Sequence, residues 1–577
     1  MVLLSHRPPR PAGGTTAPRA GRAATRSARL VSVLQAAAGG LLTETAFPDR
    51  SWWPMAFVGV ALLVLALDRD SPRWAGLVGF VWALGLFVPH LYWANEAAGV
   101  LPWLALSVLQ AALVAVGTTA WALTRRVPRL NRYGPLPAAA FALVWAAAEQ
   151  LRSSWPFGGF PWARLAFSQT EGPLLTLAWL AGAPLVSAAV AFGGFTLAAT
   201  LTLVRAHRLR SAALTAAATI ALPLAGAAIP LDTDPQSGTL RLAAVQGNVP
   251  DDDTQGPSRS RVILDNHVAG TLALLDQVAP GDLDVVLWPE NATDIDPRAD
   301  DDAWRAVDEA AQALDAPILV GTDRYIDAGR YNDMLLWEPG DGPTFSYSKQ
   351  RPAPFGEYIP LRPFVRLFSA EVDRVSIDMI PGQEPAIVPI LVPRLDRDVP
   401  VATVICFEVV YDALIRDAVV QGAELIVVPT NNASFGFTAE STQQLAMSRL
   451  RAVEHGRATV QISTVGVSAI IAPDGSVLQQ TQLFTSDQML AALPLRTSLT
   501  PADQLGEWPT IAIVALSLVA LLSRLVTTLG SSRRDRAAIA SGATGPAEPS
   551  SELDRRSTQP GAGTRQPELD DADATAN

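Results

Sequence analysis

The chain has 577 residues, of which 49% are hydrophobic and 17% are charged. It is too long for one hydrophobic core and carries less charge than a typical soluble chain, which favours a membrane protein with two or more units. The single cysteine, Cys406, excludes an intramolecular disulfide and a cysteine-rich metal site. The formal net charge of -11 is uneven, because the first 35 residues are basic and the middle third is acidic.

Residues 1–28 are rich in Pro, Gly, Ala and Arg without an apolar period, which predicts a disordered basic arm. The region 29–231 repeatedly offers apolar stretches near the roughly 20 residues that span a bilayer. We expect seven transmembrane helices there, at 30–47, 52–67, 74–93, 103–123, 136–151, 174–204 and 212–230. We expect an eighth at 508–530, followed by a disordered cytoplasmic tail over 531–577.

Arginine is concentrated after every second expected helix, whereas the alternate connecting segments hold few basic residues. This alternation follows the positive-inside rule and predicts that both termini are cytoplasmic and that the 232–507 segment lies outside the cytoplasm. Buried helices of a soluble protein do not predict such an alternation. The arginines concerned are Arg69, Arg73, Arg125, Arg126, Arg129, Arg132, Arg205, Arg208, Arg210, Arg533, Arg534 and Arg536.

The 232–507 segment alternates short β-branched runs with helical periodicity, which predicts an α/β domain built on a buried sheet. Strands are expected at 239–249, 283–291, 316–325, 331–340, 401–410, 423–432, 458–475 and 487–495. Helices are expected at 261–278, 302–315, 409–423 and 438–456.

Three reactive side chains follow strands, where they can converge at one edge of a sheet. Glu290 follows an apolar strand and a proline, although a loop glutamate is often a solvated or capping residue. Lys349 is the only lysine beside 43 arginines, which hints that arginine cannot replace it, although a surface lysine on a strand is the simpler explanation. Cys406 ends an apolar strand, where a cysteine is more often inert core.

A thiol, a carboxylate and an ammonium together support acyl transfer. The thiol attacks a carbonyl once a base takes its proton, and Glu290 is a candidate for that base. Lys349 is a candidate to stabilise the thiolate and the oxyanion of the tetrahedral intermediate. The five histidines, His6, His90, His207, His267 and His455, form no usable Cys–His pattern.

The motifs "LWPEN", "K....PFGEY" and "ICFE", in this order, resemble the nitrilase superfamily, whose triad is Glu-Lys-Cys. A nitrilase-like domain between seven spans and an eighth is similar to the apolipoprotein N-acyltransferase family over about residues 30–530. The resemblance implies an αββα sandwich outside the cytoplasm. Further matching segments are "QGNV" at 246–249, "YND" at 331–333, "NNASFG" at 431–436, "SRLRAVEHGR" at 448–457 and "GVSAIIAPDG" at 466–475.

The resemblance implies a ping-pong reaction in a bacterial cytoplasmic membrane. Cys406 would take an acyl chain from a phospholipid as a thioester, and the amine of the N-terminal diacylglyceryl-cysteine of an apolipoprotein would then attack it. It implies no metal, cofactor or nucleic acid, and we expect a monomer. The implied residues are Glu290 as base, Lys349 as oxyanion stabiliser, Cys406 as nucleophile, Glu357 and Glu408 as orienting acids, Asn332 as support and the Phe407 N–H as second oxyanion donor.

Two features depart from the family pattern. Ser434 stands where many relatives have an aromatic residue, and the acidic residues 251–253 follow "QGNVP" without the expected aromatic. Both lie on segments expected to contact lipid, so the donor preference stays open. The Trp-rich segment 153–167 fits either an acyl-chain site or a plain aromatic belt.

Two other functions stay open on the residues alone. A membrane-tethered amidase of the nitrilase type would use the same triad to hydrolyse a C–N bond, although it would need only one membrane anchor. A non-catalytic transporter or assembly protein would leave unexplained why the sole lysine and the sole cysteine fall in matching motifs.

Overall fold

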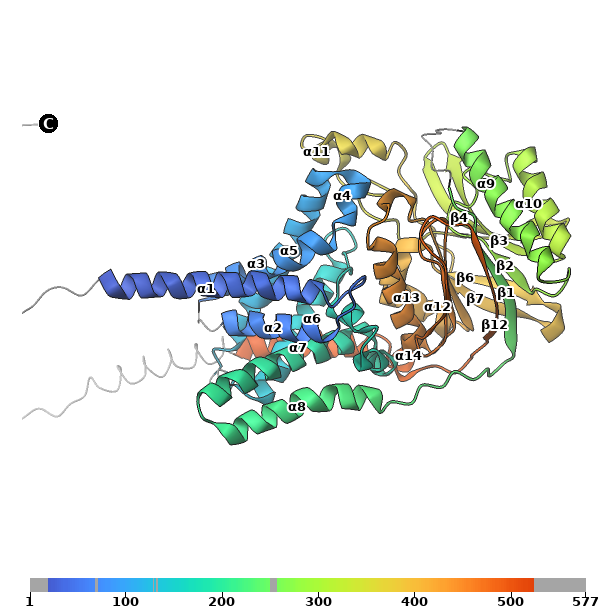
Figure 1. The fold of residues 1–577 in the computed structure, drawn as a ribbon. Coiled ribbons are helices and arrows are strands. Elements are labelled where there is room, and N and C mark those ends of the chain that lie inside the picture. Colours follow the sequence, from blue (N-terminus) through green and yellow to red (C-terminus); the bar gives the residue numbers. More distant parts are fainter. Residues whose placement is uncertain (1–18, 68–70, 128, 131–132, 250–256, 524–577) are drawn as a thin grey trace, which may run out of the picture. The chain divides into compact units, whose positions relative to one another are not determined.

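The computed structural model describes residues 19–67, 71–127, 129–130, 133–249 and 257–523 (Figure 1). The 531–577 tail, the 251–253 loop and the first 18 residues of the expected arm lie outside the described residues. Helix α1 begins at Arg19, so the prediction that residues 19–28 belong to a disordered arm is wrong. This segment consists mainly of Ala and Arg, which are strong helix formers, and it extends a helix that the following apolar residues already stabilise.

Every span expected before residue 232 lies on a helix. Among the residues that the structure describes, four helical segments are long and apolar enough to cross a membrane: Pro72–His90, Val100–Thr124, Pro173–Arg205 and Leu209–Ala227. Pro54–Ala66 and Trp508–Ser523 are apolar but shorter. The helices are α1 (Arg19–Glu44), α2 (Pro54–Ala66), α3 (Pro72–His90), α4 (Trp93–Ala98), α5 (Val100–Thr124), α6 (Pro135–Ser154), α7 (Ala178–Arg205) and α8 (Leu209–Ala227).

The α/β region contains two six-stranded mixed sheets. The first has the order β12-β1-β2-β3-β4-β5, with β1, β2 and β3 parallel to one another. The second has the order β11-β10-β9-β8-β7-β6, with β7, β8 and β9 parallel. The first sheet comprises β1 (Thr239–Gln246), β2 (Val285–Leu287), β3 (Ile318–Ile326), β4 (Gly329–Glu338), β5 (Gly342–Ser348) and β12 (Asp487–Pro494). The second comprises β6 (Ile387–Val392), β7 (Arg397–Thr403), β8 (Leu425–Thr430), β9 (Thr459–Ser463), β10 (Ala469–Ile471) and β11 (Val477–Gln480).

Helices cover the outer faces of the two sheets, as Figure 1 shows. The helices α9 (Pro257–Leu272) and α10 (Asp301–Leu314) lie on the first sheet, and α12 (Asp412–Val420) and α13 (Glu440–His455) lie on the second. The four layers form an αββα sandwich. Two short helices, α11 (Arg362–Val365) and α14 (Pro501–Leu505), complete the region.

The central strands form where the apolar runs are continuous. All six residues of β8 are buried, as expected for a strand covered on both faces. Asp300 caps the N-terminus of α10, because its side chain accepts hydrogen bonds from the N–H groups of Asp302 and Ala303. The strands β5, β6 and β11, which the sequence analysis did not list, all lie at sheet edges.

Candidate active site

Glu290 lies three residues after β2, in a turn that Pro289 separates from the strand. Its side chain is buried, and Oε1 accepts hydrogen bonds from Asn332 Nδ2 at 2.6 Å and from Lys349 Nζ at 2.9 Å. A side chain on Gly321 would meet the Pro289 carbonyl oxygen at 2.2 Å, so glycine allows β3 to pack against this turn. The turn therefore presents one carboxylate to the lysine.

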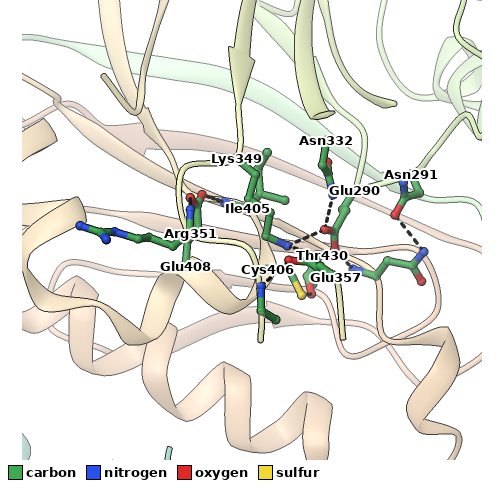
Figure 2. A network of polar contacts seen from close by, with 12 residues as sticks. Glu290, Asn291, Asn332, Lys349, Arg351, Glu357, Ile405, Cys406, Glu408 and Thr430 are labelled. Atoms are coloured by element: carbon green, nitrogen blue, oxygen red, sulfur yellow. Dashed lines mark hydrogen bonds and ion pairs between the residues drawn. The ribbon is translucent and has the colours of Figure 1, made fainter. Parts of the chain in front are cut away.

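Lys349 follows the last residue of β5 and is 1% exposed. Its ammonium lies between two carboxylates, 2.9 Å from Glu290 Oε1 and 2.6 Å from Glu357 Oε1 (Figure 2). Burial acts to lower the pKa of Lys349, but the two glutamates and Cys406 overcome this effect and hold the pKa well above its usual range. Lys349 therefore carries a fixed positive charge in a buried position.

Cys406 lies between β7 and α12, at the start of a 3-10 turn over Cys406–Val410. Its φ of 52° is in the left-handed region, which a residue with a side chain adopts at some energetic cost. The sulfur is within hydrogen-bond reach of Thr430 Oγ1 at 3.2 Å and Gln444 Nε2 at 3.6 Å. This strained turn directs the side chain toward the cluster of Glu290, Lys349 and Glu357 (Figure 2).

The surroundings of Cys406 favour the neutral thiol over the thiolate. Burial and the negative charge of Glu290 raise the pKa of the Cys406 thiol far above its usual range, and Glu440 adds to this effect. The positive charge of Lys349 and the hydrogen bond from Thr430 act in the opposite direction. Because the thiolate is the nucleophilic form of a thiol, a reaction at this sulfur would need a base to generate it.

Glu408 connects the cysteine turn to the lysine loop. Its Oε1 accepts hydrogen bonds from the backbone N–H groups of Gln350 at 2.7 Å and Arg351 at 2.9 Å. Its Oε2 accepts from the Ile405 N–H at 2.8 Å and the Tyr347 hydroxyl at 2.9 Å. Glu408 thus fixes the backbone on either side of the reacting groups rather than the ammonium of Lys349 itself.

The other expected supporting residues also lie at this place. Glu357 Oε2 accepts a hydrogen bond from the Ala353 N–H at 2.6 Å, so Glu357 holds both its own loop and Lys349. Asn332 lies on β4 and is buried, with Nδ2 bound to Glu290. Phe407 places its N–H directly after Cys406, at the turn where an oxyanion donor would be required.

The segment after α6 contacts the cysteine turn. The rings of Trp162 and Phe407 are stacked with centroids 6.0 Å apart, and Trp162 Nε1 donates to Gln443 Oε1 at 2.7 Å. Arg164 Nη1 lies 2.7 Å from Asp412 Oδ2 at the start of α12. Trp162 is buried and packs against the turn, whereas Trp155 of the same segment is exposed.

Several residues around the sulfur were not anticipated from the sequence. Thr430 ends β8, which is parallel to β7, so strand-end reasoning would have placed it beside Cys406. Gln444 belongs to a polar stripe on α13, with Ser448 and Arg451 at helical spacing. The stripe is buried, and this is visible only once the helix is packed on its sheet.

Ser434, one of the two departures from the family pattern, is exposed in a short 3-10 turn. The neighbouring Phe435 packs edge-on against Trp93 with ring centroids 5.3 Å apart. Within the part of the chain that the structure describes, no group of three or more His, Cys, Asp and Glu side chains is arranged to hold a metal ion.

Comparisons with known proteins identify the family of the chain. The family model described as the apolipoprotein N-acyltransferase N-terminal domain matches residues 39–196, and the carbon-nitrogen hydrolase model matches residues 241–499. An apolipoprotein N-acyltransferase of Mycolicibacterium smegmatis is 38% identical over 528 residues, which covers 86% of this chain and 86% of the relative. The chain belongs to the apolipoprotein N-acyltransferase family. A member from Pseudomonas putida is 31% identical, with coverage of 84% of this chain and 95% of the relative.

The two family models divide the chain where its character changes, from apolar helices to the sandwich. The triad candidates Glu290, Lys349 and Cys406 all lie inside the carbon-nitrogen hydrolase match. Among solved structures, an amidase from Nesterenkonia sp. matches with 16% identity and a TM-score of 0.35, over 49% of this chain and 98% of the amidase. That match is too weak to add to the assignment, which depends on the N-acyltransferase relatives.

Proposed function

We propose that this protein transfers an acyl chain from a membrane phospholipid to the α-amino group of the N-terminal diacylglyceryl-cysteine of bacterial apolipoproteins. The observation that carries the proposal is the cluster of Glu290, Lys349 and Cys406, in a chain of the N-acyltransferase family. In this proposal Cys406 is the nucleophile, Glu290 the general base and Lys349 the cation that stabilises developing negative charge.

The first half-reaction forms the thioester. Glu290 takes the proton of the Cys406 thiol, and the sulfur attacks the ester carbonyl of the phospholipid. Lys349 and the N–H of Phe407 stabilise the oxyanion. When the carbon–oxygen bond to glycerol breaks, Glu290 returns the proton to the leaving oxygen, so that a lysophospholipid departs and the acyl chain stays on sulfur.

The second half-reaction forms the amide. The lipoprotein amine attacks the thioester carbonyl, Glu290 takes a proton from the amine, and the carbon–sulfur bond breaks to release the N-acylated product. The thiolate then takes the proton from Glu290, and the resting thiol is restored. The raised pKa of Cys406 favours this last proton transfer.

The supporting residues keep the reacting groups in position. Glu357 holds the Lys349 ammonium from the side opposite Glu290, and Glu408 fixes the backbone before Cys406 and after Lys349. Asn332 fixes the Glu290 carboxylate through its 2.6 Å hydrogen bond. Such preorganisation lowers the cost of arranging charge during the reaction.

The domain organisation and membrane topology belong to the same proposal. Seven transmembrane helices lie within 29–231, the catalytic domain over 232–507 is extracytoplasmic, and an eighth helix over 508–530 returns the chain to the cytoplasm. Both termini are cytoplasmic and the protein acts as a monomer. The arginine-rich connections support this orientation. Green fluorescent protein fused after residue 577 should fluoresce, and alkaline phosphatase fused after residue 507 should be active; the opposite pattern would refute the topology.

An acyl-enzyme experiment tests the proposed function. The purified protein incubated with phospholipid alone should acquire an acyl mass that neutral hydroxylamine removes, and folded Cys406→Ala should not acquire it. If the wild-type protein forms no such adduct, the proposal is refuted. A product that appears as free fatty acid, with no transfer to a co-incubated diacylglyceryl lipopeptide, would favour hydrolysis instead. Intact lipoprotein maturation with Cys406→Ala would favour the non-catalytic alternative.

A further inference from the structure

The sulfur of Cys406 has a neighbour outside the proposed triad. The carboxamide of Gln444, on α13, places Nε2 at 3.6 Å from Cys406 Sγ. Gln444 is completely buried. A buried carboxamide opposite a reacting sulfur presents either an N–H donor or a carbonyl acceptor to it, and the two have opposite effects on the thiolate.

A chain of hydrogen bonds decides which group faces the sulfur. It starts at the Gly466 N–H, which can only donate, and which donates to Ser463 Oγ at 2.7 Å. The Ser463 hydroxyl donates to Asn432 Oδ1 at 2.6 Å, and the Asn432 NH₂ group faces the other way. Asn432 Nδ2 then donates to Gln444 Oε1 at 3.0 Å, which leaves the Gln444 NH₂ group facing Cys406.

Two further contacts agree with this direction. Asn432 Nδ2 also donates to Glu440 Oε2 at 2.6 Å, on the same side as Gln444. A side chain on Gly466 would meet Asn432 Oδ1 at 2.1 Å, so this position has room only for the hydrogen of glycine. The chain from Gly466 to the sulfur is thus closely packed and has one direction.

Thr430 depends on the same orientation. Its hydroxyl lies 2.9 Å from Gln444 Oε1 and 3.2 Å from Cys406 Sγ, but it has only one hydrogen to donate. Since Asn432 already donates to Gln444 Oε1, the hydroxyl hydrogen of Thr430 can turn to the sulfur when the sulfur becomes negative. A thiolate at this place would therefore receive two hydrogen bonds.

We propose that Gln444 is a catalytic residue that stabilises the Cys406 thiolate through its side-chain N–H, in an orientation that Gly466, Ser463 and Asn432 fix. The inference rests on the proposed role of Cys406 as nucleophile. When the thiol gives its proton to Glu290, the Gln444 N–H and the Thr430 hydroxyl share the charge left on sulfur until the carbon–sulfur bond forms. The same two donors stabilise the thiolate when the amide product leaves.

The sole cysteine makes the test direct, because any thiol alkylation in the full-length protein is at Cys406. The rate of alkylation by iodoacetamide, followed by intact mass between about pH 7 and about pH 9, reports the thiolate fraction. In Gln444→Leu, which keeps the bulk but loses the N–H, we expect alkylation about tenfold slower at each pH, since one hydrogen bond to a charged group is lost. The matched control is Ser448→Ala, on the same helix as Gln444, which removes a buried hydrogen bond to Gln461 of β9 and should keep the wild-type rate.

A second variant keeps the inference testable if Gln444→Leu does not fold. Ser463→Ala removes the hydroxyl that orients Asn432, and it should slow alkylation in the same direction but by less. Wild-type alkylation rates in a folded Gln444→Leu, or in Ser463→Ala when the first variant fails, would overturn the inference. Alkylation needs no phospholipid, so this result would leave the acyl-transfer proposal standing. A wild-type protein without an acyl adduct would instead refute acyl transfer.

Discussion

Glu408 makes four hydrogen bonds with one carboxylate, and the change Glu408→Gln disturbs them by replacing one oxygen with an NH₂ group. If the new amide faces Gln350 and Arg351, two backbone N–H groups lose their acceptor. If it faces the other way, the Tyr347 hydroxyl can turn to accept, and only the Ile405 N–H is left opposite a donor. The variant should adopt the second orientation because it leaves fewer donors unpaired.

The destabilisation follows from that orientation. A buried N–H without an acceptor costs about 1–3 kcal/mol, and the remaining bonds become weaker because the acceptor is no longer charged. Burial raises the pKa of Glu408, so removing the buried charge offsets part of the loss. We expect a net destabilisation of about 2–4 kcal/mol, with more in Glu408→Ala, where the buried Ile405 N–H and the part-buried N–H groups of Gln350 and Arg351 all lose their acceptor. The orphaned Ile405 N–H directly precedes Cys406, so thioester formation should also slow by about tenfold or more.

Thermal unfolding in detergent and the rate of acyl-adduct formation measure the two effects. Glu424→Gln is a matched control, because Glu424 is also a buried carboxylate, paired with Arg397 at 2.6 Å. The control should melt earlier than the wild type but form the thioester at the normal rate. If Glu408→Gln melts with the wild type and acylates at the wild-type rate, the reasoning about Glu408 is wrong.

Two further changes test charge at the site. Lys349→Arg keeps the positive charge, but a planar guanidinium does not fit between carboxylates that lie 2.9 Å and 2.6 Å from the ammonium. The rate of acyl-adduct formation should therefore fall by about a hundredfold or more. A wild-type rate would contradict this prediction. Burial raises the pKa of Glu440 from 4.5 to about 8, so its contribution to stability is complete below pH 4.5 and is lost as the pH rises to about 8. The melting temperature should therefore fall less between these pH values in Glu440→Gln than in the wild type, and equal falls would count against a buried neutral Glu440.

The central strands were predictable because both of their faces are covered, which leaves continuous apolar runs such as β8. The edge strands were not. In β11 three of the four residues are exposed. Strand β6 contains Pro389, which has no N–H to donate to a neighbouring strand and therefore fits at a sheet edge. The first residues of α1 were also missed, since an Ala- and Arg-rich segment resembles an arm until an apolar helix follows it.

At the site, the expectation that side chains directly after strands converge at one edge of a sheet placed Glu290, Lys349 and Cys406 near one another without knowledge of the fold. Gln444 escaped that expectation because a helix face becomes identifiable only after the helix is packed on a sheet. The role of Glu408 also depends on backbone N–H groups, which the sequence letters do not distinguish. Local chemistry could thus be anticipated, whereas contacts that cross elements required the folded chain.

Adjacent glutamines on α13 have different partners, and this has a practical consequence. Gln443 binds Trp162 of the segment after α6 and the backbone of His90 at the end of α3, whereas Gln444 reaches the sulfur. A soluble fragment cut at residue 232 would lose both partners of Gln443, and Asp412 would lose Arg164. Reactivity measured on such a fragment would describe a different active site, so inhibitor screens should use the entire chain in lipid or detergent.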